Sequence, residues 1–215
     1  MKKLIIFDLD GTIADTLGSI RDAVNMCMEH FGFTVHSYEQ IKSFVGFGAS
    51  ELIRRATPES ACEDAEQFEK IVKYFRSCYD ITGDRVDECY DGMYEVMSAL
   101  YDEGCVLAVF SNKPDAYVQR IIANLFPVGM ISVAMGQTSL PKKPDPTVPL
   151  MIAERLGFDV ADCYYVGDSE VDVQTARNAG MCAVAVSWGF RARDVLHEAD
   201  FIADTPSQMY DFLKR

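Results

Sequence analysis

Two aspartates, Asp8 and Asp10, lie two residues apart where the apolar run LIIF of residues 4–7 ends in DLDGT. In a strand, residues i and i+2 point to the same side, so both carboxylates are predicted to project together from the strand end. Like charges held that close repel, which either raises the pKa of one carboxyl or favours a cation between them. A simple turn at Asp10 and Gly11 is the alternative for this segment taken alone.

Polar side chains also follow other apolar runs of the chain. Ser111, Asn112 and Lys113 come directly after VLAVF, and Lys143 lies in PKKPDP. Asp168 and Asp172 follow CYYVG. In a doubly wound sheet, ligands bind at the carboxyl ends of the strands. These groups are therefore predicted to converge at one edge of one sheet.

Alternating strands and helices predict that sheet. Short runs rich in Val, Ile and Ala at 105–110, 131–135, 163–167 and 182–186 are separated by helical stretches, several of which end at glycine or begin at proline. Together with 4–7 they predict at least five strands of a doubly wound parallel α/β sheet, covered by helices on both faces.

Residues 16–82 interrupt this alternation. Apolar residues recur there at helical spacing with no plausible strand, and the segment is too long to be a simple loop. We expect a small inserted α-helical domain at 16–82 and a core domain built from 1–15 and 83–215.

Composition limits the classes of partner. The chain of 215 residues has 49% apolar and 25% charged residues, which is ordinary for a soluble globular protein. Its net charge of −13 argues against nucleic acid or an acidic membrane surface as a partner. The apolar runs are much shorter than the roughly 20 residues of a membrane span. The run in MKKLIIF is too short for the apolar region of a signal peptide.

Cysteine and histidine patterns exclude other chemistries. Seven cysteines without CxxC spacing predict reduced, mostly buried thiols in a cytoplasmic protein. The three histidines form no HxH or HExxH pattern, so neither a histidine-based triad nor a zinc site is expected.

The motifs DLDGT, FSN, KKP and GDSEVD, in that order, resemble the four motifs of the haloacid dehalogenase superfamily. The helical insertion after the first motif resembles the helical cap of that superfamily. Within it, DGTIADT, SNKP, KPDP and VGDSEVD are most similar to the phosphoglycolate phosphatases.

This resemblance implies a role for each motif residue. Asp8 would attack phosphorus to form an aspartyl phosphate, and the carboxyl of Asp10 would protonate the leaving oxygen and later activate water. Mg²⁺ would be held by Asp8, Asp168 and the main-chain carbonyl of Asp10. The phosphoryl oxygens would be bound by three residues, namely Ser111, Asn112 through its backbone amide, and Lys143.

Several further residues are assigned less directly. Asp172 is expected to position Lys143 or support the metal ligands, and Thr12 to orient Asp10. Lys113 is interpreted as an exposed lysine. Lys142 is expected to point outward.

In the insertion, Gly46 belongs to VGFGAS, which is interpreted either as a loop facing the active site or as an ordinary turn. Arg54 and Arg55 are interpreted either as solvated helix charges or as partners of a substrate carboxylate or second phosphate.

The resulting hypothesis is a Mg²⁺-dependent phosphatase of a small phosphorylated metabolite, with 2-phosphoglycolate as the first substrate to test, acting as a monomer or homodimer. A phosphosugar mutase of the β-phosphoglucomutase kind, a pyrophosphatase and a nucleotidase are the alternatives within the superfamily. A signalling receiver domain fits less well because a helical insertion follows the first strand. A catalytically dead binding protein is disfavoured by the intact Asp8, Asp10, Lys143 and Asp168.

Overall fold

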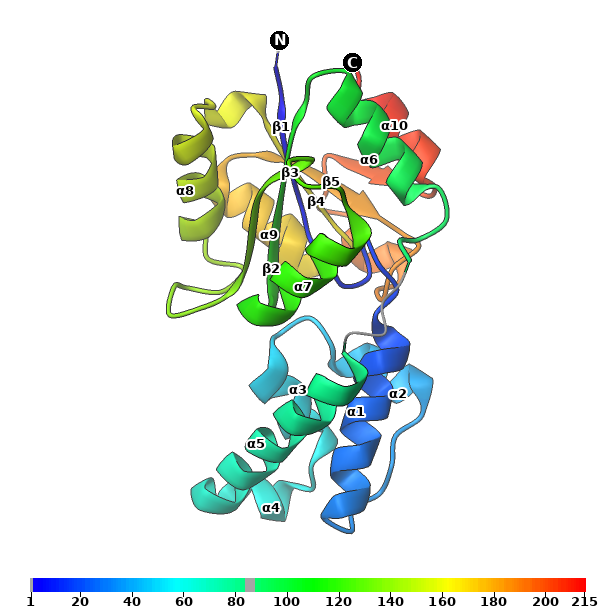
Figure 1. Ribbon diagram of the computed structural model, residues 1–215, viewed down its shortest axis with the longest axis vertical. Helices are drawn as coiled ribbons and strands as arrows, with labels where there is room; N and C mark the ends of the chain where they lie inside the picture. Colours follow the sequence, from blue (N-terminus) through cyan, green and yellow to red (C-terminus); the bar gives the residue numbers. More distant parts are fainter. Residues whose placement is uncertain (1, 84–87) are drawn as a thin grey trace.

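The computed structural model describes residues 2–83 and 88–215, and its centre is a parallel β-sheet. The described ranges contain six strands in the order β3-β2-β1-β4-β5-β6, with every neighbouring pair parallel (Figure 1). The strands are β1 (Leu4–Phe7), β2 (Val106–Pro114), β3 (Ile131–Gln137), β4 (Cys163–Gly167), β5 (Cys182–Val186) and β6 (Phe201–Ala203). The doubly wound parallel sheet is confirmed, and the three-residue β6 is an edge strand too short to have been predicted.

Helices cover both faces of the sheet because the side chains of each strand alternate between the faces. In β1, Ile5 and Phe7 pack into one apolar cluster, whereas Leu4 and Ile6 pack into another. The first cluster is completed by α6 (Met93–Asp102), α7 (Asp115–Leu125) and α10 (Pro206–Leu213). The second is completed by α8 (Thr147–Leu156), α9 (Glu170–Ala179) and the 3₁₀ turn η2 (Arg193–Leu196), and a second 3₁₀ turn, η1 (Val160–Asp162), precedes β4. Burial on both faces explains why the strands read as nearly continuous apolar runs.

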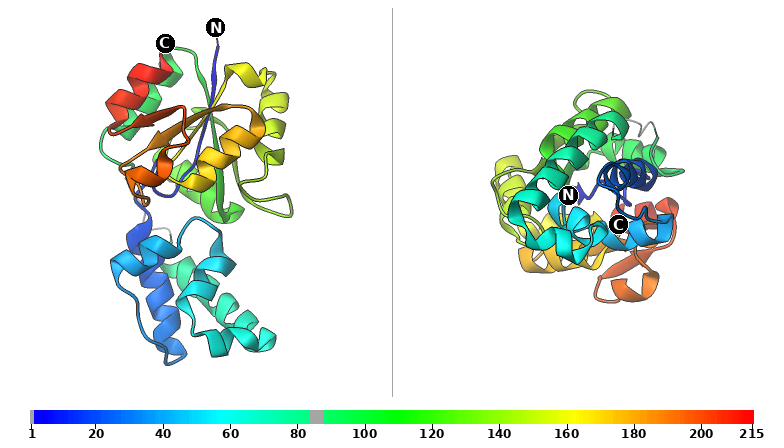
Figure 2. Two further views of the ribbon diagram at one scale, coloured as in Figure 1. Left: turned by 180° about the vertical axis from the view of Figure 1, so that it is seen from behind. Right: turned by 90° about the horizontal axis from the view of Figure 1, so that it is seen from below.

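Five helices form a separate group at the end of the sheet where β1 and β2 finish (Figures 1 and 2). They are α1 (Leu17–His30), α2 (Tyr38–Phe44), α3 (Ala49–Ala56), α4 (Glu59–Glu63) and α5 (Ala65–Thr82). Asp64 separates the last two, and its carboxylate accepts hydrogen bonds from the amides of Glu66 and Gln67 at the start of α5.

These helices bury an apolar cluster of their own. Val24 and Met28 of α1 meet Ile53 of α3 and Ile71 of α5, and all four side chains are buried. We therefore propose the division expected from the sequence, with a cap at 16–82 and a core of 1–15 and 83–215. The boundary residues 84–87 lie outside the described residues.

Two chain-wide expectations can be compared with the structure. All seven cysteines, each within the described ranges, are free thiols, although only Cys27, Cys78 and Cys163 are buried and the other four are partly exposed. No helix in the described part of the chain is long and apolar enough to cross a membrane.

The apolar cluster of the cap predicts unequal effects of two methionine substitutions in α1. Met28 is fully buried, whereas Met26 is 36% exposed. Met28→Ala should lower the free energy of unfolding by about 2–5 kcal/mol, because it removes buried methylene groups and leaves a cavity. Met26→Ala, the matched control, should change it by about 0.5 kcal/mol or less. Urea unfolding measures both, and equal effects would contradict the packing described here.

Candidate active site

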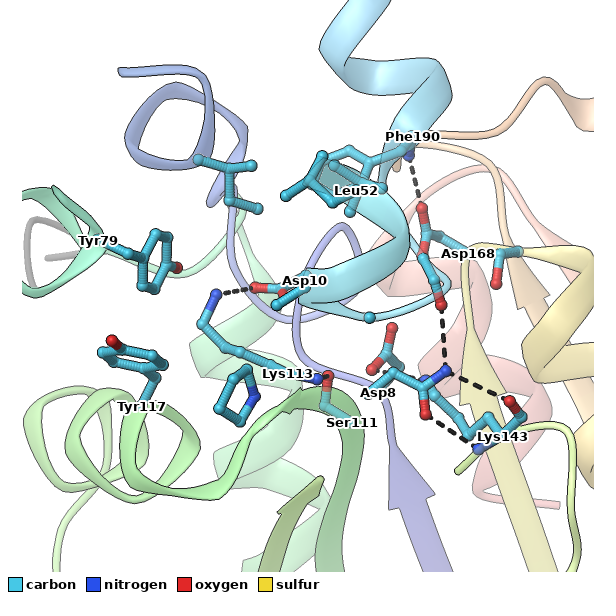
Figure 3. Close-up of a pocket in the computed structure, with 18 of the residues that line it drawn as sticks. Asp8, Asp10, Leu52, Tyr79, Ser111, Lys113, Tyr117, Lys143, Asp168 and Phe190 are labelled. Carbon is cyan, nitrogen blue, oxygen red and sulfur yellow. Dashed lines mark hydrogen bonds and ion pairs between the residues drawn. The ribbon is translucent and has the colours of Figure 1, made fainter. Parts of the chain in front are cut away.

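Four predicted motif residues meet at the carboxyl edge of the sheet (Figure 3). Asp8 directly follows β1, Ser111 lies near the end of β2, and Asp168 directly follows β4. Lys143 comes from the segment between β3 and α8. All four side chains are buried and line one cavity beneath the cap.

Lys143 links two of the carboxylates. Its Nζ lies 2.8 Å from Asp8 Oδ1 and donates a hydrogen bond of 2.6 Å to Asp172 Oδ1. Burial alone would lower the pKa of Lys143, but the charges of Asp172 and Asp8 raise it well above its usual value. The ammonium therefore stays charged and provides a fixed positive group beside Asp8.

Asp172 is held by the start of α9. Its Oδ2 accepts hydrogen bonds from the amide of Ser169 at 3.1 Å and from its hydroxyl at 2.5 Å. The Ser169 hydroxyl in turn accepts from the amide of Asp172, which completes a capping box. Because both oxygens of Asp172 are engaged, one of them by Lys143, we propose that Asp172 positions Lys143.

Asp8, Asp168 and Asp172 form a buried acidic cluster whose ligand atoms lie within 4.8 Å of one another. Burial, followed by the nearby charge of Asp172 among other groups, raises the pKa of Asp8 to about 6 despite the opposing effect of Lys143. Burial and the charges of Asp172 and Asp8 likewise raise the pKa of Asp168 well above its usual value. Asp10, the carboxylate expected to repel Asp8, also raises the pKa of Asp8, but burial and Asp172 have larger effects.

Asp168 is fixed by hydrogen bonds from two loops. The amide of Phe190 donates to Oδ2 at 2.6 Å, and the hydroxyl of Thr12 lies 3.5 Å from Oδ1. The expectation that Thr12 orients Asp10 is therefore wrong, because the turn after β1 directs this hydroxyl toward the end of β4.

Two glycines allow the chain to pass close to Asp168. A Cβ atom at Gly11, where φ is +83°, would lie 2.5 Å from Asp168 Oδ2, and one at Gly189 would lie 2.4 Å from the same oxygen. Any larger residue would push the carboxylate out of place. Gly189 follows β5 far from the motifs, so no local pattern in the sequence indicated it.

Lys113 is a second buried lysine of the site, and the interpretation of it as exposed is wrong. Its Nζ donates to Asp10 Oδ1 at 2.8 Å, and only 4% of the side chain is exposed. Burial would lower the pKa of Lys113, but the charge of Asp10 raises it above its usual value. Because β2 continues to Pro114, Lys113 points to the same side as Ser111, which the two-residue period of a strand could have indicated.

Asn112 points away from Ser111 and Lys113. Its Oδ1 accepts from the amide of Lys143 at 2.9 Å, and its Nδ2 donates to the carbonyl of Gly46 at 3.1 Å. The side chain of Asn112 thus positions the Lys143 segment and contacts the cap.

Three core side chains hold the loop of residues 45–48 between α2 and α3, which we call the cap loop. The carbonyls of Val45, Gly46 and Phe47 accept hydrogen bonds from Arg191 at 2.6 Å, Asn112 at 3.1 Å and Lys142 at 2.9 Å, respectively. Lys142 is exposed as expected. Gly46 has φ of +111°, which favours glycine, and it lines the cavity together with Val45 and Gly48, so the cap loop faces the site and is fixed to the core.

The cavity lies between these polar groups and the cap. Leu52 of α3 and Phe75 and Tyr79 of α5 line its cap side. Arg54 and Arg55, interpreted either as solvated helix charges or as partners of the substrate, do not line it. Arg54 is exposed and stacks on Phe68, with its guanidinium carbon 4.4 Å from the ring centroid. Arg55 is exposed and pairs with Glu51 at 2.8 Å, so both arginines fit the first interpretation, a solvated helix charge, and the second, contact with the substrate, is wrong.

The carboxylate groups fit a divalent cation. Among the residues that the structure describes, two lysines, Lys143 and Lys113, pair with this group of four carboxylates, which leaves an excess of two negative charges if all are ionised; the carboxylates are those of Asp8, Asp10, Asp168 and Asp172. Asp8 Oδ1 is buried and accepts no hydrogen bond in the described part of the chain, although Lys143 lies within ion-pair distance. Carboxylate oxygens are the preferred ligands of hard cations, so Asp8 and Asp168 could hold one.

Comparison with known proteins assigns the family. The model of the family "haloacid dehalogenase-like hydrolase" matches residues 5–186. A phosphoglycolate phosphatase of Xanthomonas campestris pv. campestris is 30% identical over 213 residues, which cover 97% of this chain and 95% of that protein. The chain therefore belongs to the haloacid dehalogenase-like hydrolases, as its motif order predicted.

Solved structures agree with this assignment. The crystal structure of a predicted phosphoglycolate phosphatase from Haemophilus somnus has a TM-score of 0.89 and 28% identity, covering 98% of this chain and 97% of that one. A β-phosphoglucomutase from Clostridium difficile has a TM-score of 0.82 and 18% identity, covering 100% and 96%. The second similarity is one of fold alone.

The contacts of the cap loop predict how a substitution of Arg191 affects the local stability of this loop. Arg191 also donates to the carbonyl of Lys42 at 2.9 Å, so Arg191→Met removes two hydrogen bonds from a charged group. Amide hydrogen exchange at residues 45–48 should become roughly tenfold faster or more. Arg193→Met is the matched control, because Arg193 is exposed and pairs with Asp204. Unchanged exchange in both variants would show that Arg191 does not hold the loop.

Proposed function

We propose that this chain is a Mg²⁺-dependent phosphatase of small phosphomonoesters and that 2-phosphoglycolate is its substrate. Family membership and the similarity to proteins named phosphoglycolate phosphatase support hydrolysis of a phosphate ester. The observation that matters most is the position of Asp8, a buried carboxylate at the end of the central strand, beside Lys143 and Asp168.

Asp8 is the proposed nucleophile. Its carboxylate attacks phosphorus, the bond to the leaving oxygen breaks, and the resulting aspartyl phosphate is then hydrolysed by water. Mg²⁺, bound by Asp8, Asp168 and the main-chain carbonyl of Asp10, would neutralise charge between the carboxylates and the phosphate. Lys143, the Ser111 hydroxyl and the backbone amide of Asn112 bind the remaining phosphoryl oxygens.

Asp10 is the proposed general acid and base. It lies two residues beyond Asp8, and its side chain is 13% exposed at the cavity. From there it protonates the leaving oxygen in the first step and takes a proton from water in the second. Lys113 holds this carboxyl in position through its 2.8 Å hydrogen bond.

The mutase alternative has no specific support, because the likeness to β-phosphoglucomutase extends to the fold alone. A mutase keeps the phosphoryl group on its product, whereas a phosphatase releases inorganic phosphate. Assay of a panel of phosphorylated metabolites for phosphate release, with and without Mg²⁺, tests the proposed function and its substrate. A cytoplasmic location is part of the proposal and is supported by the seven free thiols.

The acidic cluster predicts that Mg²⁺ stabilises the protein without substrate. A cation bound only to the folded state at a hundred times its Kd adds about 2.7 kcal/mol, which raises Tm by roughly 5–10 °C for a chain of this size. Calorimetry of EDTA-treated protein before and after Mg²⁺ addition measures the shift. Asp168→Asn should abolish most of it, whereas Asp102→Asn, at an exposed residue, should retain it. An equal shift in both variants would remove Asp168 from the metal site.

The covalent mechanism predicts that Asp8→Asn lowers kcat by roughly 10³-fold or more, because an amide is a poor nucleophile. Asp15→Asn is the matched control, since Asp15 is exposed nearby and asparagine can also accept the hydrogen bond from the amide of Leu17.

With wild-type enzyme, added methanol should divert the same fraction of phosphate to methyl phosphate whatever the leaving group. A fraction that depends on the leaving group would argue against a common aspartyl phosphate.

A further inference from the structure

The two buried lysines of the site contact different carboxylates. Lys143 pairs with Asp8, the proposed nucleophile, whereas Lys113 pairs with Asp10, the proposed acid. Figure 3 shows the two lysines on opposite sides of Asp8, with Lys113 facing Tyr79 and Tyr117. Binding of the phosphoryl group explains Lys143 but not why a second lysine should be buried beside the acid.

Lys113 retains unused hydrogen-bonding capacity. An ammonium has three N–H donors, and within the described ranges Lys113 directs one to Asp10 Oδ1 and lies beside the Tyr79 hydroxyl, which leaves at least one donor for a ligand. Its Nζ lies 4.9 Å from the ring centroid of Tyr79, and both residues line the cavity. Donors are therefore available for a ligand that enters beside Asp10.

The hydroxyl of Tyr79 is a second polar group at the cavity. Tyr79 is 4% exposed, and its hydroxyl oxygen, which lies near Lys113 and Ser19, has no close hydrogen-bond partner among the residues that the structure describes. Buried hydroxyls are normally paired, because an unpaired one loses its hydration without compensation. The ring of Tyr117 packs edge-to-face against the ring of Tyr79 at a centroid distance of 4.6 Å. The hydroxyl of Tyr117 donates to Asp80 at 2.7 Å. Tyr79 is thus held in place with a free polar group at the cavity.

The surrounding lining selects for a small anion. Beyond Tyr79, the described part of the cap contributes apolar side chains, including Ile20, Leu52 and Phe75, and one cation, the exposed Arg76. No acidic residue lines the cavity from the described part of the cap. An ammonium and a hydroxyl next to such a lining bind a compact acceptor with negative charge better than a neutral polar group.

We propose that Lys113 and Tyr79 form a subsite for a carboxylate on the leaving portion of the substrate, and that this subsite gives the enzyme its preference for acidic phosphomonoesters. The inference rests on the proposed function. In the proposed mechanism Asp10 contacts the ester oxygen, and Lys113 contacts Asp10. A substrate carboxylate bound by Lys113 must therefore lie very close to the ester oxygen. In 2-phosphoglycolate a single methylene group separates the two, which matches this arrangement.

The test compares two substrates that differ at one group. 2-Phosphoglycolate carries a carboxylate where 2-hydroxyethyl phosphate carries a hydroxymethyl group, so the ratio of their kcat/KM values measures recognition of the carboxylate. Any general effect of a substitution on Asp10 changes both values and cancels in the ratio. We expect wild-type enzyme to favour 2-phosphoglycolate.

Lys113→Met should lower this ratio by roughly 10- to 100-fold, mainly through KM for 2-phosphoglycolate, because it removes a charged hydrogen-bond donor. Tyr79→Phe should lower it by about 2- to 10-fold, since only a hydroxyl is lost. Lys113→Arg, which retains the charge, should recover part of the preference. Lys73→Met and Tyr74→Phe on α5 are matched controls that do not line the cavity, and they should leave the ratio unchanged.

An unchanged ratio in Lys113→Met and Tyr79→Phe, with active wild-type enzyme, would overturn the subsite and leave the phosphatase function standing. The same holds if wild-type enzyme hydrolyses both substrates equally well. If wild-type enzyme releases phosphate from neither compound nor from any other phosphomonoester, the proposed function itself fails. If Lys113→Met does not fold, the ratio of kcat/KM values in Tyr79→Phe tests the subsite by itself. This substitution removes one hydroxyl and leaves the ring unchanged.

Discussion

The concentration of buried carboxylates at one edge of the sheet is the constraint on which the rest of the site depends. Asp8, Asp168 and Asp172 lie within 4.8 Å of one another, and Lys143 neutralises only part of their charge. Such a cluster is costly to bury unless each oxygen has a partner or a cation binds between them. The start of α9 holds Asp172 and the loop after β5 holds Asp168, whereas Asp8 Oδ1 accepts no hydrogen bond from the described residues and has only the ion-pair contact with Lys143 at 2.8 Å.

Close backbone approaches make this concentration sterically feasible. A Cβ atom at Gly167 would lie 2.2 Å from Cβ of Asp172, just as atoms at Gly11 and Gly189 would collide with Asp168. The three glycines come from the turn after β1, the end of β4 and the loop after β5. The carboxylates can therefore converge only because these three segments present no side chain at the points of contact.

The cap is attached to the core through groups that also belong to the site. Asn112 contacts both the Lys143 segment and the carbonyl of Gly46, so one side chain connects the proposed phosphate-binding lysine to the cap loop. Tyr117 and Phe190 of the core pack into the apolar cluster of the cap. In the proposed mechanism this arrangement would separate two tasks, with the polar core residues at the phosphoryl group and Lys113 and the cap at the leaving portion.

The sequence by itself determined the sheet, the inserted helices and the motif residues that converge. Strand and helix periods are local properties, and the carboxyl ends of parallel strands necessarily share an edge, so Asp8, Ser111 and Asp168 could be placed together without a structure. Only the tertiary structure decided the contacts of Lys113, Thr12, Gly189, Arg54 and Arg191. Lys113 and Asp10 are 103 residues apart, and Arg191 and Val45 are 146 apart. Such contacts depend on how loops and the cap pack against the sheet, which no local spacing records.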